Sequence, residues 1–137
     1  MATFNKFNSF VEAEAEKVHN LGSDTLTVAL CAAANAPTAS NTVLANLTQI
    51  SYTNLSSRAI TTVSSSQTSG TYKLVLTDLV LTASGSVGPF RYAVIYNDTA
   101  ASDELIGYAD YASDITLATG ETFTLDFDGT NGLMQKT

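Results

Sequence analysis

The side chains best suited to chemistry in this chain are one histidine and one cysteine. His19 and Cys31 are the only residues of their kinds, so a zinc site of the usual Cys/His composition cannot be assembled. A serine nucleophile would need His19 as its base, and no serine lies in a nucleophile-elbow motif. We interpret His19 as a helix-end residue, favoured there by the helix dipole. We interpret Cys31 as a small buried hydrophobic residue at the end of a strand.

Carboxylates form a second set of candidate groups. They flank two turns, with Asp98, Asp103 and Glu104 at the first and Asp126 and Asp128 at the second. With Asn131, the second turn resembles a loose calcium loop, but it lacks the acidic residue that closes an EF-hand. A glycosidase needs paired carboxylates in a groove lined with aromatic residues, and the chain has no tryptophan. We therefore predict no catalytic residues, no metal site, no cofactor and no enzymatic activity.

Four tyrosines offer a different kind of surface. Tyr92, Tyr96, Tyr108 and Tyr111 fall in two strand-like segments. Such tyrosines more often form cross-strand pairs than ligand sites. They still leave open a second interpretation, in which these rings form a glycan-binding surface.

The elements that position these residues begin with one helix. Apolar residues recur at three- and four-residue steps, at Phe7, Phe10, Val11, Ala15 and Val18. This spacing predicts an amphipathic helix over residues 3–19, with Gly22 placed to end it. A helix of this length is marginal alone in water. It must therefore lie on a surface, either its own β-body or a neighbouring molecule.

The rest of the chain has the pattern of short strands and turns. Residues 24–31 predict a half-buried strand, residues 90–96 predict a central strand, and residues 133–136 predict a last edge strand. Residues 42–55 fit either a short helical turn or an edge strand, and residues 64–70 predict a flexible connection. Further strands are expected at residues 58–63, 72–76, 79–81, 105–111 and 123–127.

These elements predict a mainly β fold in a single domain. We expect an antiparallel β-sandwich or Greek-key barrel with one N-terminal amphipathic α-helix. Residues 1–22 form the helix or arm, and residues 23–137 form the β-body.

Charge excludes several kinds of partner. The net charge is −7 and charged residues make up only 14% of the chain. We expect no nucleic acid, because phosphate binding needs clustered lysine and arginine, and no membrane partner, because a polybasic patch and a membrane-spanning run are missing. The N-terminus lacks the apolar region of a signal peptide, so we expect synthesis in a cytoplasm.

Several stretches of the chain are specific enough to suggest a family. Residues 7–12 read FNSFVE, residues 18–26 read VHNLGSDTL, residues 89–98 read PFRYAVIYND, and residues 117–123 read LATGETF. Together they resemble a family of small virion proteins of tailed bacteriophages, and the resemblance covers nearly the whole chain.

The resemblance implies a structural protein of the particle, best assigned as a capsid decoration (cement) protein. The alternative is a tail or fibre module that binds a host surface glycan through the four tyrosines. A decoration protein stabilises the shell by bridging capsomers, and it lies on the capsid exterior after synthesis in the host bacterial cytoplasm. Its implied partners are the major capsid protein and further copies of itself, as a dimer or trimer. The family has no catalytic motif to carry over.

The predicted helix supplies the candidate interface. Its apolar face carries Phe4, Phe7, Phe10 and Val11, which we expect to anchor the protein on the shell. The alternative is that this face packs on the protein's own sheet.

Overall fold

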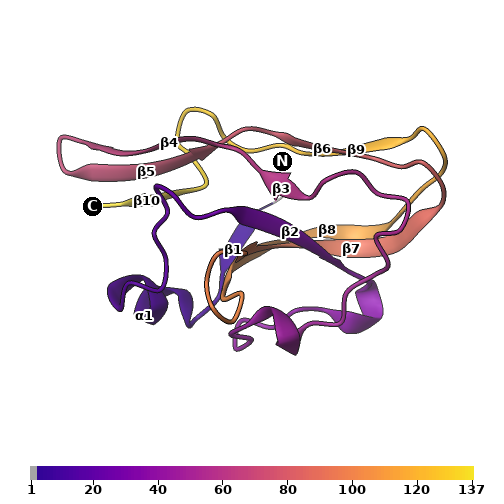
Figure 1. Cartoon of the computed structure of the whole chain (residues 1–137), viewed down its shortest axis with the longest axis horizontal. Coiled ribbons are helices and arrows are strands. Elements are labelled where there is room, and N and C mark those ends of the chain that lie inside the picture. The colour runs from indigo at the N-terminus through magenta and orange to yellow at the C-terminus, as the bar shows by residue number, and fades with distance from the viewer. Residues whose placement is uncertain (1–2) are drawn as a thin grey trace.

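The computed structural model describes residues 3–137 as stacked antiparallel sheets (Figure 1). The largest sheet has five strands in the order β1-β8-β7-β2-β3. These strands are β1 (Phe4–Lys6), β8 (Leu105–Leu117), β7 (Val87–Asn97), β2 (Leu26–Cys31) and β3 (Ala59–Ile60).

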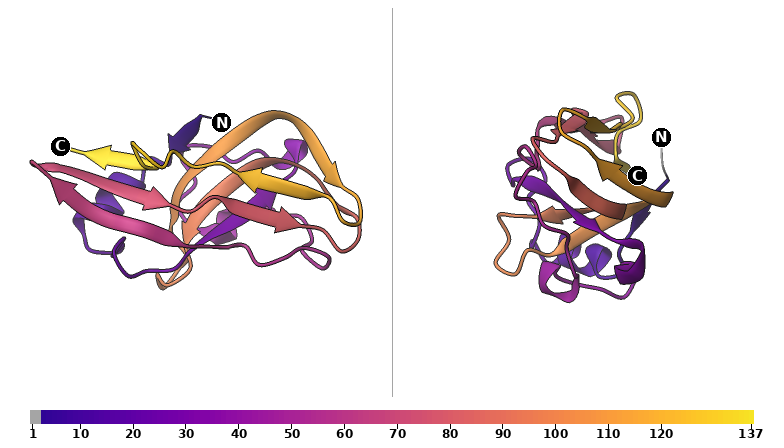
Figure 2. Two further views of the ribbon diagram at one scale, coloured as in Figure 1. Left: turned by 90° about the horizontal axis from the view of Figure 1, so that it is seen from above. Right: turned by 90° about the vertical axis from the view of Figure 1, so that its right-hand side faces the viewer.

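Two smaller sheets form a second layer. One has the order β10-β5-β4 and the other pairs β6 with β9, and both lie on the same side of the five-stranded sheet (Figures 1 and 2). Their strands are β10 (Met134–Lys136), β5 (Thr71–Leu76), β4 (Thr62–Thr68), β6 (Leu79–Thr82) and β9 (Thr122–Leu125). The predicted mainly β, antiparallel architecture is confirmed. The Greek-key barrel alternative is wrong, because no sheet within residues 3–137 closes on itself.

The core lies on both faces of the five-stranded sheet. Between the two layers, side chains from every sheet pack in one cluster, including Val28, Leu30, Leu74, Leu81 and Phe90. A second cluster covers the opposite face and includes Phe7, Ala29, Cys31, Val94 and Leu105. The predicted central strand, now β7, is confirmed. All six residues of β2 are buried, so the half-buried strand prediction is wrong, because small side chains on its outer face are covered as well.

The predicted helix over residues 3–19 is wrong. Residues Phe4–Lys6 form β1, which pairs antiparallel with β8, and the helix α1 spans only Phe10–Ala15. It ends well before Gly22, and Lys17 has a left-handed backbone with φ of 66°. The apolar spacing has another cause: Phe7 packs in the cluster on one face of the sheet and Phe10 in the cluster on the other. The segment therefore wraps around the sheet edge instead of presenting one helical stripe.

The structure also decides three other predictions made from the sequence. Residues Leu44–Asn46 form a short 3-10 turn, held by the Asn46 side chain, which accepts hydrogen bonds from the backbone of Thr42 and Val43. The flexible connection predicted at residues 64–70 is wrong, because most of it belongs to β4, which pairs with β5 around a Ser69-Gly70 turn. The predicted last edge strand is confirmed as β10.

Candidate functional site

A partly buried polar cluster joins the N-terminal segment to the turn between β7 and β8. Its members are His19, Asp24, Asn97 and Glu104, which come from three separate parts of the chain. Asn97, the last residue of β7, is fully buried. The cluster therefore connects the segment after α1 to the end of β7 through side-chain hydrogen bonds.

The orientation of the Asn97 amide is fixed by its own turn. Its Oδ1 accepts hydrogen bonds from the backbone N–H groups of Thr99 at 3.0 Å and Ala100 at 3.2 Å. Its Nδ2 must therefore face the other way, where it donates to Asp24 Oδ2 at 2.6 Å and to His19 Nδ1 at 3.0 Å. All the hydrogen-bonding capacity on the nitrogen of this amide is used.

This arrangement determines the state of His19. Because Asn97 donates to Nδ1, that nitrogen must be an acceptor, so the imidazole is neutral with its proton on Nε2. Within residues 3–137, His19 Nε2 is buried without a hydrogen-bond partner, and so is Glu104 Oε2.

Electrostatics agree with a neutral imidazole. Burial lowers the pKa of His19, and the carboxylates of Glu104, Asp24 and Glu14 oppose that shift only in part. The helix-end interpretation of His19 is wrong, because α1 ends at Ala15. The ring of His19 instead packs against Phe10, with 5.3 Å between centroids.

The four candidate interface residues lie in different environments. Phe7 is fully buried, Phe10 is 5% exposed, and Phe4 is half-buried on β1. Val11 is 55% exposed on α1. The structure therefore directs the phenylalanines towards this chain's own sheet and leaves Val11 on the surface.

The tyrosines do not form a common surface. Tyr92 and Tyr96 are buried, and Tyr108 packs with them and with Phe7. Tyr111 packs instead in the other cluster, against Phe123 at 4.9 Å between ring centroids. A flat platform for sugar stacking is thus not assembled from these four rings.

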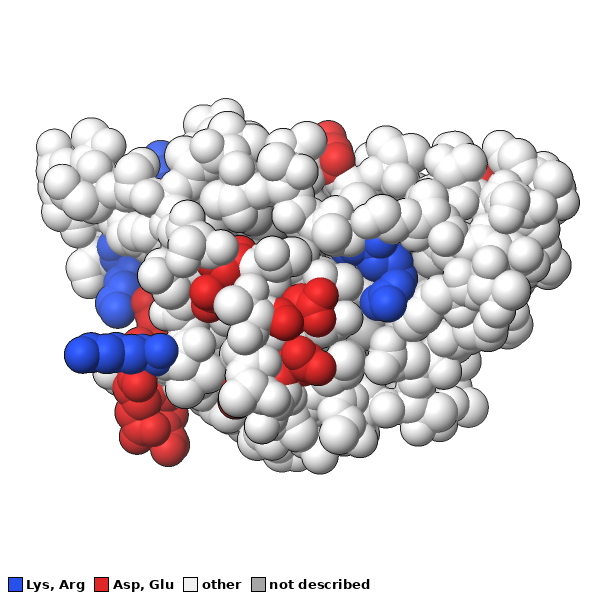
Figure 3. Space-filling model, in the orientation of Figure 1, with Lys and Arg blue, Asp and Glu red and all other residues white. Residues whose placement is uncertain are grey.

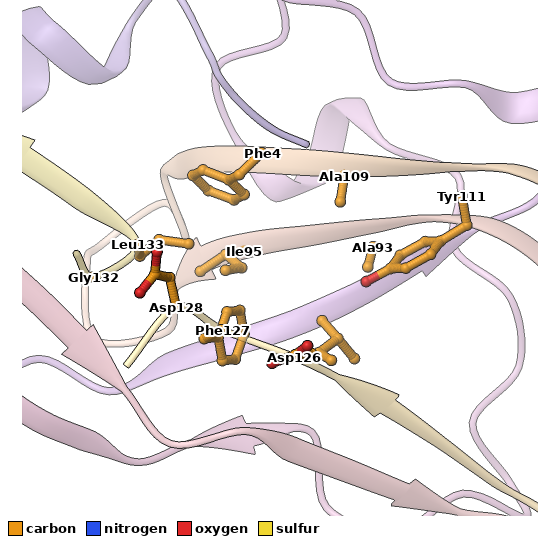
Figure 4. A pocket seen from close by; sticks show the side chains of 11 residues that line it. Phe4, Ala93, Ile95, Ala109, Tyr111, Asp126, Phe127, Asp128, Gly132 and Leu133 are labelled. Atoms are coloured by element: carbon orange, nitrogen blue, oxygen red, sulfur yellow. The ribbon is translucent and has the colours of Figure 1, made fainter. Parts of the chain in front are cut away.

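One small cavity opens between the large sheet and the C-terminal loop (Figure 4). Its volume is about 120 Å³, and its lining includes Phe4, Ile95, Phe127 and the carboxylates of Asp126 and Asp128. This is well below the size of usual small-molecule sites. The cavity can hold a few waters or a short aliphatic group.

The second carboxylate turn has a structural role. Asp128 accepts hydrogen bonds from the backbone of Thr130 and from the backbone and side chain of Asn131. These donors lower the pKa of Asp128. Among residues 3–137, no group of three or more His, Cys, Asp or Glu side chains is placed to hold a metal ion.

Cys31 has the environment of a core residue. It is fully buried, and desolvation raises its pKa to about 11. A thiol with this pKa is almost entirely protonated at neutral pH, as the interpretation as a buried hydrophobic residue requires.

Sequence reasoning missed two positioning contacts. Asn97 was visible only as part of a turn-forming Asn-Asp pair, which gave no sign of its burial. Arg58 stacks on the Tyr52 ring at 3.7 Å and donates to the backbone oxygen of Val28. A lone arginine beside a predicted strand carries no signal for such a contact.

Acidic side chains gather near the middle of the face seen in Figure 3, with basic side chains on either side. None of the helices formed by residues 3–137 combines the length and the apolar character needed to span a membrane. No protein-family model, curated protein or solved structure matches this chain.

Proposed function

We propose that this protein is a structural component of a tailed-bacteriophage particle that binds the outside of the capsid and stabilises it by bridging capsomers. The resemblance of residues 7–26 and 89–98 to small phage virion proteins supports this proposal. The stacked sheets support the finer assignment to the antiparallel β-sandwich class. The implied partners are the major capsid protein and further copies of this chain.

The observation that carries the proposal is the way the N-terminal segment is held. Phe7 and Phe10 are buried in the two clusters on opposite faces of the large sheet, so α1 is fixed on the body. Val11, on the same helix as Phe10, points to solvent and is 55% exposed. A rigid apolar side chain loses little conformational entropy on binding, which makes Val11 a suitable anchor for a folded partner surface.

The expected mechanism depends on many weak contacts. A single small contact gives modest affinity, but an oligomer that touches neighbouring capsomers gains from effective concentration. The surface suits this role, because charged residues make up only 14% of the chain. Few like charges are therefore brought together where two copies touch.

A binding assay on expanded capsids tests the proposal. Purified protein is sedimented with capsids that lack their decoration protein, and the bound fraction is measured against concentration. Val11→Asp should weaken binding at least tenfold. Val80→Asp is the matched control, because Val80 is also a valine, is 51% exposed, and lies on β6 in the other layer.

The outcomes separate the parts of the proposal. Absence of wild-type binding would contradict capsid decoration. Equal binding by the two variants would leave decoration in place and exclude Val11 as the anchor. Immunogold labelling of intact particles distinguishes a shell position from the alternative tail or fibre position, since label at the tail tip would favour the glycan-binding module.

A further inference from the structure

We propose that β4 is a dimerisation edge, at which two copies of this chain pair their β4 strands antiparallel around a twofold axis. The paired strands would join two three-stranded sheets into one six-stranded sheet. The proposal names the surface used between copies and does not depend on capsid binding, because pairing can be measured on the isolated protein.

The first argument is the unused backbone of β4. The strand is at the edge of its sheet, with β5 on one side only. Thr68 pairs with Thr71 across a two-residue turn, Ser69-Gly70, in which both residues have positive φ, so the backbone groups of this pair face each other.

The alternation of an antiparallel ladder then turns the backbone N–H and C=O of Ser65 and Gln67 away from β5. Within residues 3–137, no other segment donates to or accepts from these four groups. They form a regular donor and acceptor row that another strand can complete.

The second argument is charge. Residues 59–72 contain no acidic or basic side chain, and the tip of this hairpin is white in Figure 3. By contrast, the edge strands β1 and β10 carry Lys6 and Lys136. Around a twofold axis a strand edge meets the same edge of the other copy, so an edge that carries charge of one sign would repel itself. In a chain of net charge −7, two copies approach with least repulsion along an uncharged strand.

The third argument is register. A bulge at Val63 interrupts the pairing of β4 with β5, so the regular part of the strand is residues 64–68. Its midpoint is Ser66. Pairing centred on Ser66 places Ser65 of one copy opposite Gln67 of the other, and both outward-facing residues then exchange backbone hydrogen bonds. The two Ser66 side chains face each other across the axis as a non-hydrogen-bonded pair, the closer type of antiparallel pair.

This register gives a direct crosslinking test. Ser66→Cys should form a disulfide-linked dimer under mild oxidation, because facing residues in such a pair have the Cβ separation that a disulfide accepts. Ser86→Cys is the control, because Ser86 is likewise exposed but lies before β7, away from the hairpin. Native Cys31 is fully buried and does not compete. We expect dimer formation by Ser66→Cys at least ten times faster than by Ser86→Cys, and equal rates would overturn the proposal.

A second variant tests the backbone. Gln67→Pro, placed in the Ser66→Cys protein, removes an outward N–H and leaves the backbone ladder between β4 and β5 intact, as an edge strand tolerates. It also removes the Gln67 Oε1 that accepts from the Gly70 N–H, so Gln67→Ala in the same protein is its control. We expect Gln67→Pro to slow crosslinking at least tenfold with an unchanged far-ultraviolet circular dichroism spectrum. Crosslinking at an unchanged rate would show that β4 does not pair through its backbone. If the spectrum changes, a Ser66→Lys variant of the wild-type protein is tested in place of Gln67→Pro. The two facing lysines should repel each other and lower the dimer fraction measured by sedimentation equilibrium. An unchanged dimer fraction would contradict the pairing.

Discussion

The Asn97 side chain donates a hydrogen bond to Nδ1 of His19 across 3.0 Å. Two backbone N–H groups hold the amide oxygen on the other side, so the amide cannot rotate to accept from a protonated imidazole. The contact therefore requires neutral His19. It makes the attachment of the N-terminal segment to the large sheet sensitive to pH.

The first prediction concerns that pH dependence. The folded-state pKa of His19 is lowered, mainly by burial, so between that value and the ordinary value of about 6.5 the unfolded chain binds more protons. The free energy of unfolding should therefore fall as pH decreases below about 6.5. His19→Asn keeps an acceptor near Nδ1 but cannot titrate.

Urea denaturation at pH 7.5 and pH 5.5 measures this effect. We expect the wild-type protein to lose more stability over this interval than His19→Asn, whose remaining pH dependence comes from the carboxylates. Equal losses in the two proteins would show that His19 is not the titrating group.

The second prediction concerns Asn97 itself. Asn97→Ala leaves the Thr99 and Ala100 N–H groups, His19 Nδ1 and a carboxylate without their buried partner, which should cost about 3 kcal/mol in the free energy of unfolding. Asn97→Asp should be more costly at pH 7.5, because it places a carboxylate oxygen where Nδ2 lies 2.6 Å from Asp24 Oδ2.

Chemical denaturation measures both variants, with Asn35→Ala as the control at an exposed asparagine. The control should change stability by less than about 0.5 kcal/mol. An Asn97→Asp protein as stable as wild type would show that the amide nitrogen is not essential to the cluster.

The third prediction concerns how β1 is seated. Gly107 lies directly beneath the Phe4 ring: a Cβ added there would overlap the ring and come within 2.7 Å of the Asn5 backbone oxygen. Gly107→Ala must therefore push β1 away from β8. We expect a loss of about 2–3 kcal/mol in the free energy of unfolding and faster proteolytic cleavage in the first ten residues.

Gly129→Ala is the matched control, because a Cβ there meets no atom within 4 Å and the residue has no positive φ. It should leave stability and cleavage rate unchanged. Phe4→Ala combined with Gly107→Ala should restore part of the lost stability if the ring overlap is the cause, and no restoration would assign the loss to the backbone contact alone.

The sequence predicted the strands whose side chains alternate clearly and missed the features that depend on distant partners. Residues 90–96 and 133–136 were identified from local pattern. The helix predicted over residues 3–19 is wrong, because Phe7 and Phe10 show helical spacing but pack on opposite faces of a sheet. This arrangement depends on the pairing of β1 with β8, which brings the segment to the edge of the sheet.

The same limit applies to the candidate site. The Asn97-Asp98 pair correctly indicated a turn, since side chains of this type bond to backbone two residues on. That His19 would lie at 3.0 Å from an amide 78 positions later in the chain depends on how the N-terminal segment folds back. No local pattern carries that information.

The last prediction concerns the reactivity of Cys31. The thiol is fully buried, and desolvation raises its pKa to about 11, so both access and thiolate fraction are low at pH 7.5. We expect native protein to react with a thiol reagent at least a hundredfold more slowly than the unfolded chain. A time course of labelling, with and without guanidinium chloride, measures the ratio.

The Gly107→Ala variant tests whether labelling of Cys31 requires global unfolding. Cys31 packs in the same cluster as Phe7, so displacing β1 should accelerate labelling, whereas Gly129→Ala should not. Rapid labelling of the native wild-type protein would contradict the burial of this face of the sheet.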